Sequence, residues 1–130
     1  TGTWYFHGVV SARTGNKFLG GAGCNYQFVF DEPASKFGGY FATNANMAGA
    51  KAKLYDKAEN LLGEFDVKAP ISEWAWSGWE VLSGEGIMRV EIYANNQYNG
   101  YIMSDDIEYN VIPEPAAFGL LALGLLLRRR

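Results

Sequence analysis

The sequence predicts an all-β protein, an antiparallel β-sandwich of the jelly-roll type, followed by a short apolar helix at the C-terminus. Short runs of alternating apolar and polar residues, separated by Gly, Asn, Asp and Pro, extend over residues 1–110. None of these runs has a helical period. The 130 residues are 48% hydrophobic and 15% aromatic, which is enough to build the core of one domain.

Nine segments have the length and the alternation of strands. In a strand, successive side chains point to opposite faces, so Tyr26, Phe28 and Phe30 share one face and Gln27 and Val29 the other. This one-sided pattern is typical of an antiparallel sheet with one solvent-facing side. The predicted strands are Trp4–Val10, Lys17–Leu19, Tyr26–Phe30, Phe37–Thr43, Ala50–Tyr55, Leu61–Val67, Trp74–Val81, Met88–Tyr93 and Tyr101–Tyr109.

Turn-forming residues separate these segments. Pro33 has no N–H to donate to a strand ladder, so we expect the strand that begins at Tyr26 to end before it. The polar segment Asp56–Asn60 is expected to form a hairpin loop. Short strands at this spacing predict a sandwich.

The last predicted strand has an alternation of its own. Strict alternation places Glu108 on the same face as Ile102 and Ser104, and places Met103 and Asp105 on the opposite face. We take this alternation, like that of the other strands, to fit an antiparallel sheet with one solvent-facing side.

The last twenty residues differ from the rest. The motif Pro113-Glu114-Pro115 is followed by twelve apolar or Gly residues, 116–127, and then by Arg128, Arg129 and Arg130. The prolines favour an extended linker, and the Leu-rich run favours a helix of ~18 Å, shorter than the ~30 Å core of a bilayer. The chain thus divides into a sandwich domain at residues 1–110 and a C-terminal segment at residues 111–130.

This C-terminal segment resembles the PEP-CTERM sorting signal of Gram-negative bacteria that possess an exosortase. The resemblance implies export, transient anchoring in the inner membrane with the arginines on the cytoplasmic side, and cleavage near the motif by the exosortase, a membrane cysteine transpeptidase. It also implies delivery to the cell surface or the exopolysaccharide matrix, often with glycosylation. The alternative is an ordinary C-terminal helix with a basic end.

The preceding domain also looks like the β-sandwich that recurs among PEP-CTERM proteins. The similarity extends over about residues 17–109, and its motifs include Tyr26–Phe30, Phe37–Phe41, Gly86–Ile92 and Gly100–Tyr109. Such domains resemble carbohydrate-binding jelly rolls. The resemblance implies a destination for the protein more than an activity.

Aromatic residues provide a candidate ligand site. Flat aromatic side chains can stack against the apolar face of a pyranose ring, and Trp74 and Trp76 share one face of their strand. The candidate ligand-binding residues are therefore Trp74, Trp76, Tyr98 and Tyr101. The alternative is packing in the core, as large aromatic residues do in small sandwiches, and Trp79 is the residue we expect there.

A calcium site is a second candidate. Asp105 and Asp106 fall late in the last strand, where jelly-roll binding modules often hold a structural Ca²⁺. The ion needs six to eight oxygen ligands, for which loop oxygens of Asn44, Asn46 and Glu85 are the candidates. Since adjacent strand residues point to opposite faces, only one of the two Asp side chains can face inward. A solvated strand end is the alternative.

Other function classes are disfavoured. A net charge of −3 argues against a nucleic-acid partner, and one Cys with one His excludes a Cys/His zinc site within the chain. No spacing of glutamates marks the carboxylate pair of a glycosidase, and His7 has no Ser or Asp pattern of a triad beside it. We therefore expect no enzymatic activity, and no cofactor other than Ca²⁺.

These observations lead to three functional hypotheses. The first is an exported structural or adhesive protein of the cell surface or matrix, whose partners are an exosortase, the inner membrane and exopolysaccharide or other glycans. The alternative is a carbohydrate-binding module with a Ca²⁺-stabilised jelly roll. A secreted glycan-active enzyme is the third and least supported hypothesis.

Overall fold

The computed structural model of the chain describes residues 2–4, 6–7, 10–20, 25–44, 50–94 and 101–112. Every regular element within these ranges is a β-strand, and the strand pairings are antiparallel. The predicted C-terminal helix, the Pro113-Glu114-Pro115 motif, the three terminal arginines and Tyr98 lie outside the described residues. Within the described ranges, no helix has the length and hydrophobicity needed to cross a membrane.

The described strands follow the predicted segments closely from residue 18 onward. They are β1 (Gly2–Trp4), β2 (Phe6–His7), β3 (Val10–Ser11), β4 (Phe18–Gly20), β5 (Asn25–Thr43), β6 (Lys51–Tyr55), β7 (Leu61–Asp66), β8 (Ala75–Glu80), β9 (Ile87–Tyr93) and β10 (Ile102–Val111).

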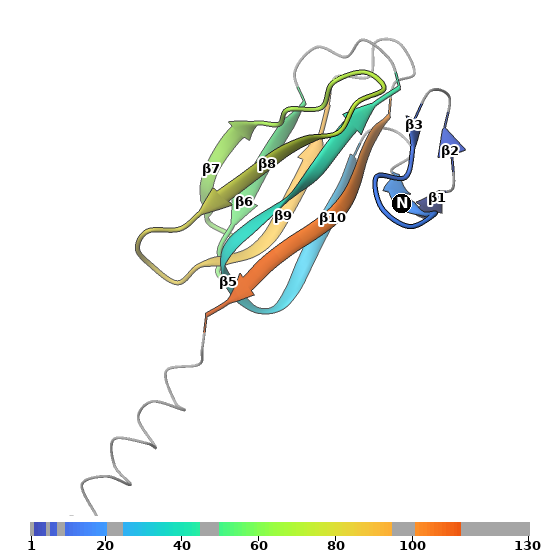
Figure 1. Cartoon of the computed structure of the whole chain (residues 1–130). Coiled ribbons are helices and arrows are strands. Elements are labelled where there is room, and N and C mark those ends of the chain that lie inside the picture. Colours follow the sequence, from blue (N-terminus) through green and yellow to red (C-terminus); the bar gives the residue numbers. More distant parts are fainter. Residues whose placement is uncertain are drawn as a thin grey trace, which may run out of the picture.

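The long strand β5 belongs to both layers of the sandwich. Its first part, residues 25–29, pairs with β9, which continues through β6 to β7. Its second part, residues 36–43, lies between β8 and β10, and β10 continues through β4 to β1. In Figure 1 the second part of β5, with β8 and β10, forms the nearer layer, and β9 and β6 lie behind it. The predicted antiparallel β-sandwich is therefore confirmed.

The prediction that β5 ends before Pro33 is wrong. The strand passes through this residue, although its register with β9 shifts between Val29 and Ala34. A proline is tolerated there because it lies in the irregular stretch, where no ladder partner needs its missing N–H. The Pro33 carbonyl instead accepts a hydrogen bond from the Ile112 N–H at 2.7 Å. The proline thus marks the bend between the two layers.

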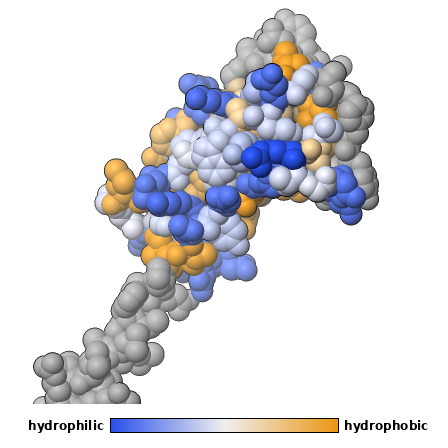
Figure 2. All heavy atoms as spheres, viewed as in Figure 1, coloured by the Kyte–Doolittle hydropathy of each residue, from blue (hydrophilic) through white to orange (hydrophobic). Residues whose placement is uncertain are grey.

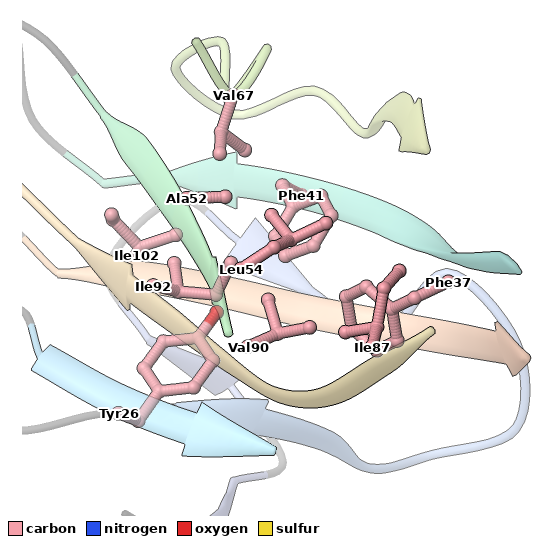
Figure 3. Close-up of a cluster of buried hydrophobic side chains, with 10 residues drawn as sticks. All are labelled: Tyr26, Phe37, Phe41, Ala52, Leu54, Val67, Ile87, Val90, Ile92 and Ile102. Carbon is pink, nitrogen blue, oxygen red and sulfur yellow. The ribbon is translucent and has the colours of Figure 1, made fainter. Parts of the chain in front are cut away.

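The main core lies between the layers (Figure 3). Phe37 and Phe41 project into it from β5, where they meet side chains from β6, β9 and β10. Trp79 is partly buried against this core and stacks on Phe37 with 6.2 Å between ring centroids, as predicted for a core tryptophan. The cluster comprises Tyr26, Phe37, Phe41, Ala52, Leu54, Val67, Ile87, Val90, Ile92 and Ile102.

A second, smaller cluster covers one end of the nearer layer on its outer side. Ala42 of β5 and Met103 of β10 are fully buried there under Val10 and Phe18, with Trp74 packed against the group. The N-terminal strands therefore cover this end of the outer face. The other end, around Gly38 and Glu108, is left open.

A bulge in β10 determines which side chains reach this open end. Asp105 pairs with Tyr40, but Glu108 pairs with Gly38, so β10 holds one more residue than β5 between these pairs. Asp106 accommodates the bulge with a φ of 47°. The prediction that Glu108 shares a face with Ile102 is therefore wrong. The extra residue turns Glu108 to the outer face, with Asp105.

Candidate functional site

Three neighbouring strands, β8, β5 and β10, present one open surface on the outer side of the nearer layer. Directly opposite residues of antiparallel strands share a face, so the pairings align the side chains in rows. One row holds Asn110, Lys36 and Glu80, the next Glu108, Gly38 and Gly78, and the third Asp105, Tyr40 and Trp76. We call these nine residues the platform face.

Trp76 is the centre of the platform face because its ring lies over two glycines. A Cβ atom added to Gly38 would come within 2.6 Å of Trp76 Cζ2, and one added to Gly78 within 3.1 Å of Trp76 Nε1. The indole therefore occupies the space that side chains at these positions would fill. Trp76 remains 43% exposed, so one side of the ring is supported by the sheet and the other faces solvent.

A hollow of about 300 Å³ adjoins the ring. Its polar rim includes Lys36, Glu80, Glu108 and Asn110. Lys36 and Glu80 form an ion pair with 3.5 Å between Nζ and Oε1. Figure 2 shows this surface: atoms of intermediate hydropathy, the pale colour of Trp, Tyr and Gly, gather over β5, β8 and β10, with strongly hydrophilic atoms beside them. The surface combines an aromatic floor with hydrogen-bonding groups.

Tyr40 connects the ring of Trp76 to a fixed loop. The two rings meet edge to face, with centroids 5.2 Å apart and an interplanar angle of 68°. On the other side of Tyr40, the Arg13 guanidinium carbon lies 3.5 Å from the ring centroid, a cation–π contact. Arg13 also forms an ion pair with Asp106. The aromatic side chains are thus held in place from one end.

The loop that contains Arg13 is bound to the β10 bulge. The backbone N–H groups of Arg13 and Thr14 donate to Asp105 Oδ2 at 2.8 and 3.3 Å. The hydroxyl of Thr14 donates to Asp106 Oδ1, and this hydrogen bond, together with Arg13, lowers the pKa of Asp106 below its usual value. The two carboxylates therefore anchor the loop to the sheet.

These contacts bear on the predicted calcium site. In the structure the Asp105 and Asp106 carboxylates accept hydrogen bonds from N–H and O–H groups of Arg13 and Thr14. Among the described residues, no group of three or more His, Cys, Asp or Glu side chains is placed to hold a metal ion. Calcium binding stays a prediction.

Trp74 lies on the same outer side as Trp76 but has different surroundings. Its indole packs against Phe18, with ring centroids 5.8 Å apart and an angle of 71°. Its Nε1–H donates to the Ser11 carbonyl oxygen at 3.0 Å. These contacts give Trp74 a packing role, and of the two tryptophans it is Trp76 that offers an open ring.

Of the two tyrosines in the predicted site, the structure describes Tyr101, which lies apart from the platform face. Tyr101 precedes β10, and its backbone N–H donates to Asn44 Oδ1 at 2.8 Å, at the end of the strand away from Glu108. Tyr98 lies outside the described residues. Of the three members of the predicted set that the structure describes, Trp76 is the one on the platform face.

Several residues of the platform face were not singled out by the sequence analysis. Gly38 and Gly78 carry a signal that could have been used, since glycine in a strand often marks a place where another group approaches the backbone closely. Tyr40 could have been found by pairing its strand with that of Trp76. Glu108 could not, because its position depends on the bulge.

A larger hollow of about 640 Å³ lies between the first part of β5 and the end of β10. It is lined by Phe30, Tyr109, Val29 and two acidic residues, Asp31 and Glu32, among others. Phe30 and Tyr109 contact each other at 5.0 Å between centroids. The described lining of this hollow contains no tryptophan and no glycine over which a ring could lie, so we regard the platform face as the better candidate.

No protein-family model matches the chain, and no curated protein matches it. Solved structures do resemble it. The K2 cleaved adhesin domain of Lys-gingipain matches with a TM-score of 0.55 and 15% identity, over 79% of this chain and 77% of that one. The second family 16 carbohydrate-binding module matches with a TM-score of 0.51 and 12% identity, over 75% and 79%.

Another similar structure is the CBM22-1 xylan-binding domain from Paenibacillus barcinonensis Xyn10C. Its TM-score is 0.50 at 13% identity, and the match extends over 86% of this chain and 84% of that domain. A glycoside hydrolase family 43 arabinoxylan arabinofuranohydrolase from Bacillus subtilis matches over 85% of this chain but 24% of its own. At these identities the comparisons show the fold, a β-sandwich shared with carbohydrate-binding and adhesin domains.

Proposed function

We propose that this domain binds glycans on the platform face, with a sugar ring stacked on Trp76. The observation that carries the proposal is the half-exposed indole supported by Gly38 and Gly78. The occurrence of the same fold in carbohydrate-binding modules adds support. The proposal favours the hypothesis of a carbohydrate-binding module over that of a purely structural protein.

The chemistry of sugars suits this surface. One face of a pyranose presents C–H groups, and contact of this face with an apolar ring removes apolar surface from water, which favours binding. The hydroxyls project around the edge of the sugar. On the platform face, Asn110, Lys36 and the two carboxylates Glu80 and Glu108 surround the hollow beside Trp76. Carboxylates accept hydrogen bonds from hydroxyls, and the amide both donates and accepts them.

The proposed role is non-enzymatic. Glycosidases place two carboxylates on either side of the scissile bond, and both must reach the bound sugar. On the platform face, Glu80 is paired with Lys36 and lies in a different row from Glu108, on an open sheet surface. This arrangement suits recognition of an exposed chain.

Nuclear magnetic resonance tests the proposal with an internal control. Nitrogen-15-labelled protein is titrated with soluble oligosaccharides, including neutral, acidic and amine-bearing chains, and the indole N–H signals are assigned with Trp→Phe variants. We expect the Trp76 signal to shift while the Trp74 signal, hydrogen-bonded to Ser11, stays in place. Absence of binding by every oligosaccharide, or shifts confined to other residues, would contradict the proposal.

We also propose that the protein reaches its glycans through a PEP-CTERM pathway. The support is the order of the Pro113-Glu114-Pro115 motif, the apolar run and the three arginines in the sequence. Its partners are then an exosortase and, before cleavage, the inner membrane. The mature domain is displayed at the cell surface or in the exopolysaccharide matrix, with an adhesive or structural role.

Intact mass spectrometry of the protein from its native host tests this pathway. Loss of the residues that follow the motif in wild-type cells, but not in cells without the exosortase, is the expected result. An unprocessed chain ending at Arg130 in both strains would show that the tail is not a sorting signal. This experiment is independent of the glycan proposal.

A further inference from the structure

We propose that Glu108 makes the platform face select sugars that carry a protonated amino group, such as glucosamine units, over neutral sugars and uronic acids. This inference rests on the proposed glycan-binding function and names the class of sugar. It is drawn from the position of Glu108, its lack of a partner among the described residues, and the pairing of the neighbouring charges.

The row geometry places Glu108 at the edge of the aromatic floor. Glu108, Gly38 and Gly78 lie directly opposite one another on β10, β5 and β8. The Trp76 ring covers the two glycines, and its Cζ2 edge is the part that lies over Gly38. A sugar stacked on this ring therefore directs its equatorial substituents on that side toward Glu108.

The charge of Glu108 is not compensated within the described part of the chain. The described residues provide no ion pair or side-chain hydrogen bond to its carboxylate, and its side chain is exposed. Lys36 is paired with Glu80 at 3.5 Å, and Arg13 is paired with Asp106. Both cations are thus paired with other carboxylates, and among the charged residues that line the hollow Glu108 contributes the net negative charge.

A protonated sugar amine can be bound by two features of the platform face, the Glu108 carboxylate and the indole of Trp76. The ammonium group can form a charge-assisted hydrogen bond with the Glu108 carboxylate. The negative face of the indole also attracts positive charge near it. A uronic acid brings a second carboxylate close to Glu108, and the repulsion between the two charges weakens its binding. A neutral sugar is bound through the stacking and the hydroxyl hydrogen bonds alone, so its affinity should be lower than that of the amine.

Calorimetry with three oligosaccharides of equal length tests the inference. The probes are glucosamine oligomers, their fully N-acetylated counterparts and galacturonate oligomers, at a pH that protonates the free amine. We expect the order of affinity amine, then N-acetyl, then uronate. Glu108→Gln should weaken binding of the glucosamine oligomer about fivefold, which corresponds to ~1 kcal/mol and to the upper range for an exposed charge pair.

Two further variants sharpen the result. Glu108→Lys should reverse the order, so that galacturonate binds better than glucosamine. Glu91→Gln is the matched control, because it removes one carboxylate from β9 in the other layer, where Glu91 is bonded to Arg89. Its affinities should equal those of the unmodified domain. Circular dichroism verifies that each variant is folded.

The outcomes separate this inference from the proposed function. If N-acetylated and free-amine oligomers bind equally, or if Glu108→Gln leaves the preference intact, the amine inference is overturned and the glycan-binding function stands. If none of the three oligomers, nor any neutral glycan, binds the folded domain, both are overturned.

Discussion

Removal of the Trp76 ring should weaken glycan binding about tenfold and also reduce stability. A fully exposed tryptophan offers up to ~250 Å², so a residue that is 43% exposed presents about 110 Å² to a ligand. If one sugar ring covers half of this area, Trp76→Ala loses about 50 Å² of apolar contact. At ~25 cal/mol per Å², this is ~1.3 kcal/mol, or about a factor of ten in Kd.

The buried part of the same residue predicts the stability cost. About 140 Å² of Trp76 is covered by the sheet and Tyr40, which corresponds to ~3.5 kcal/mol for an extended unfolded chain. Real unfolded chains are more compact, so we expect a loss of about 2–3 kcal/mol in the free energy of unfolding. Urea denaturation followed by circular dichroism measures this change.

Trp74→Ala is the matched control for the binding assay. It removes a tryptophan from the same outer side, along with the contact to Phe18 and the hydrogen bond to Ser11. It should therefore lower stability while leaving the Kd for glycans unchanged. A folded Trp76→Ala domain that binds glycans as tightly as the unmodified one would refute the stacking argument, as would an equal loss of affinity in both variants.

The remaining predictions concern the support of the ring, the core and the β10 bulge. Gly78→Val should displace the indole, since a Cβ atom there already comes within 3.1 Å of Trp76 Nε1. We expect it to reduce glycan affinity severalfold and to lower the urea midpoint, because the indole loses part of its contact with the sheet. Unchanged affinity would contradict the support of the ring by the two glycines. The hydroxyls of Tyr26 and Ser104 are buried and form no well-aligned hydrogen bond within the described structure, although they lie close enough that Ser104 opposes the rise that burial causes in the pKa of Tyr26. Replacing both, in the double variant Tyr26→Phe with Ser104→Ala, should therefore raise the free energy of unfolding by ~1 kcal/mol. A double variant less stable than the unmodified domain in urea denaturation would show that the two hydroxyls stabilise the core. Asp106→Asn should remove part of the acid sensitivity of the fold: the pKa of Asp106 is lowered in the folded state, so its contribution is present above the usual Asp pKa and disappears as the pH falls through the lowered value. Urea denaturation of the unmodified domain and of Asp106→Asn, between neutral and strongly acidic pH, measures how the free energy of unfolding depends on pH in each. Parallel pH dependences would show that Asp106 does not contribute to the acid sensitivity.

Much of the fold was predictable because alternation in a strand is a local property. The segments from Lys17 onward correspond to β4–β10, with ends that differ by a few residues, and the Asp56–Asn60 loop connects β6 to β7 as expected. There, the Asn60 N–H donates to Asp56 Oδ1 at 2.9 Å. The exception is the passage of β5 through Pro33, because a proline can sit at a bend where the neighbouring strand shifts its register.

The candidate site was predictable only in part. That Trp74 and Trp76 share a side follows from their spacing, and the structure agrees. That one is packed and the other open depends on the N-terminal strands, which cover the Trp74 end through Phe18 and Val10. A local pattern cannot predict this difference, since the covering residues lie more than fifty positions away in the sequence.

The sequence by itself determined the all-β class, most strand positions from Lys17 onward, the acidic character and the unusual C-terminal segment, because composition, alternation and motif order are read along the chain. The tertiary structure alone decided which face is open and which residues meet on it. Gly38 of β5, Gly78 of β8 and Glu108 of β10 come together through strand pairing, and one extra residue in β10 turns Glu108 outward. Register between distant strands depends on the packing of the whole sandwich, and this is why the ligand-facing surface emerges only when the chain is folded.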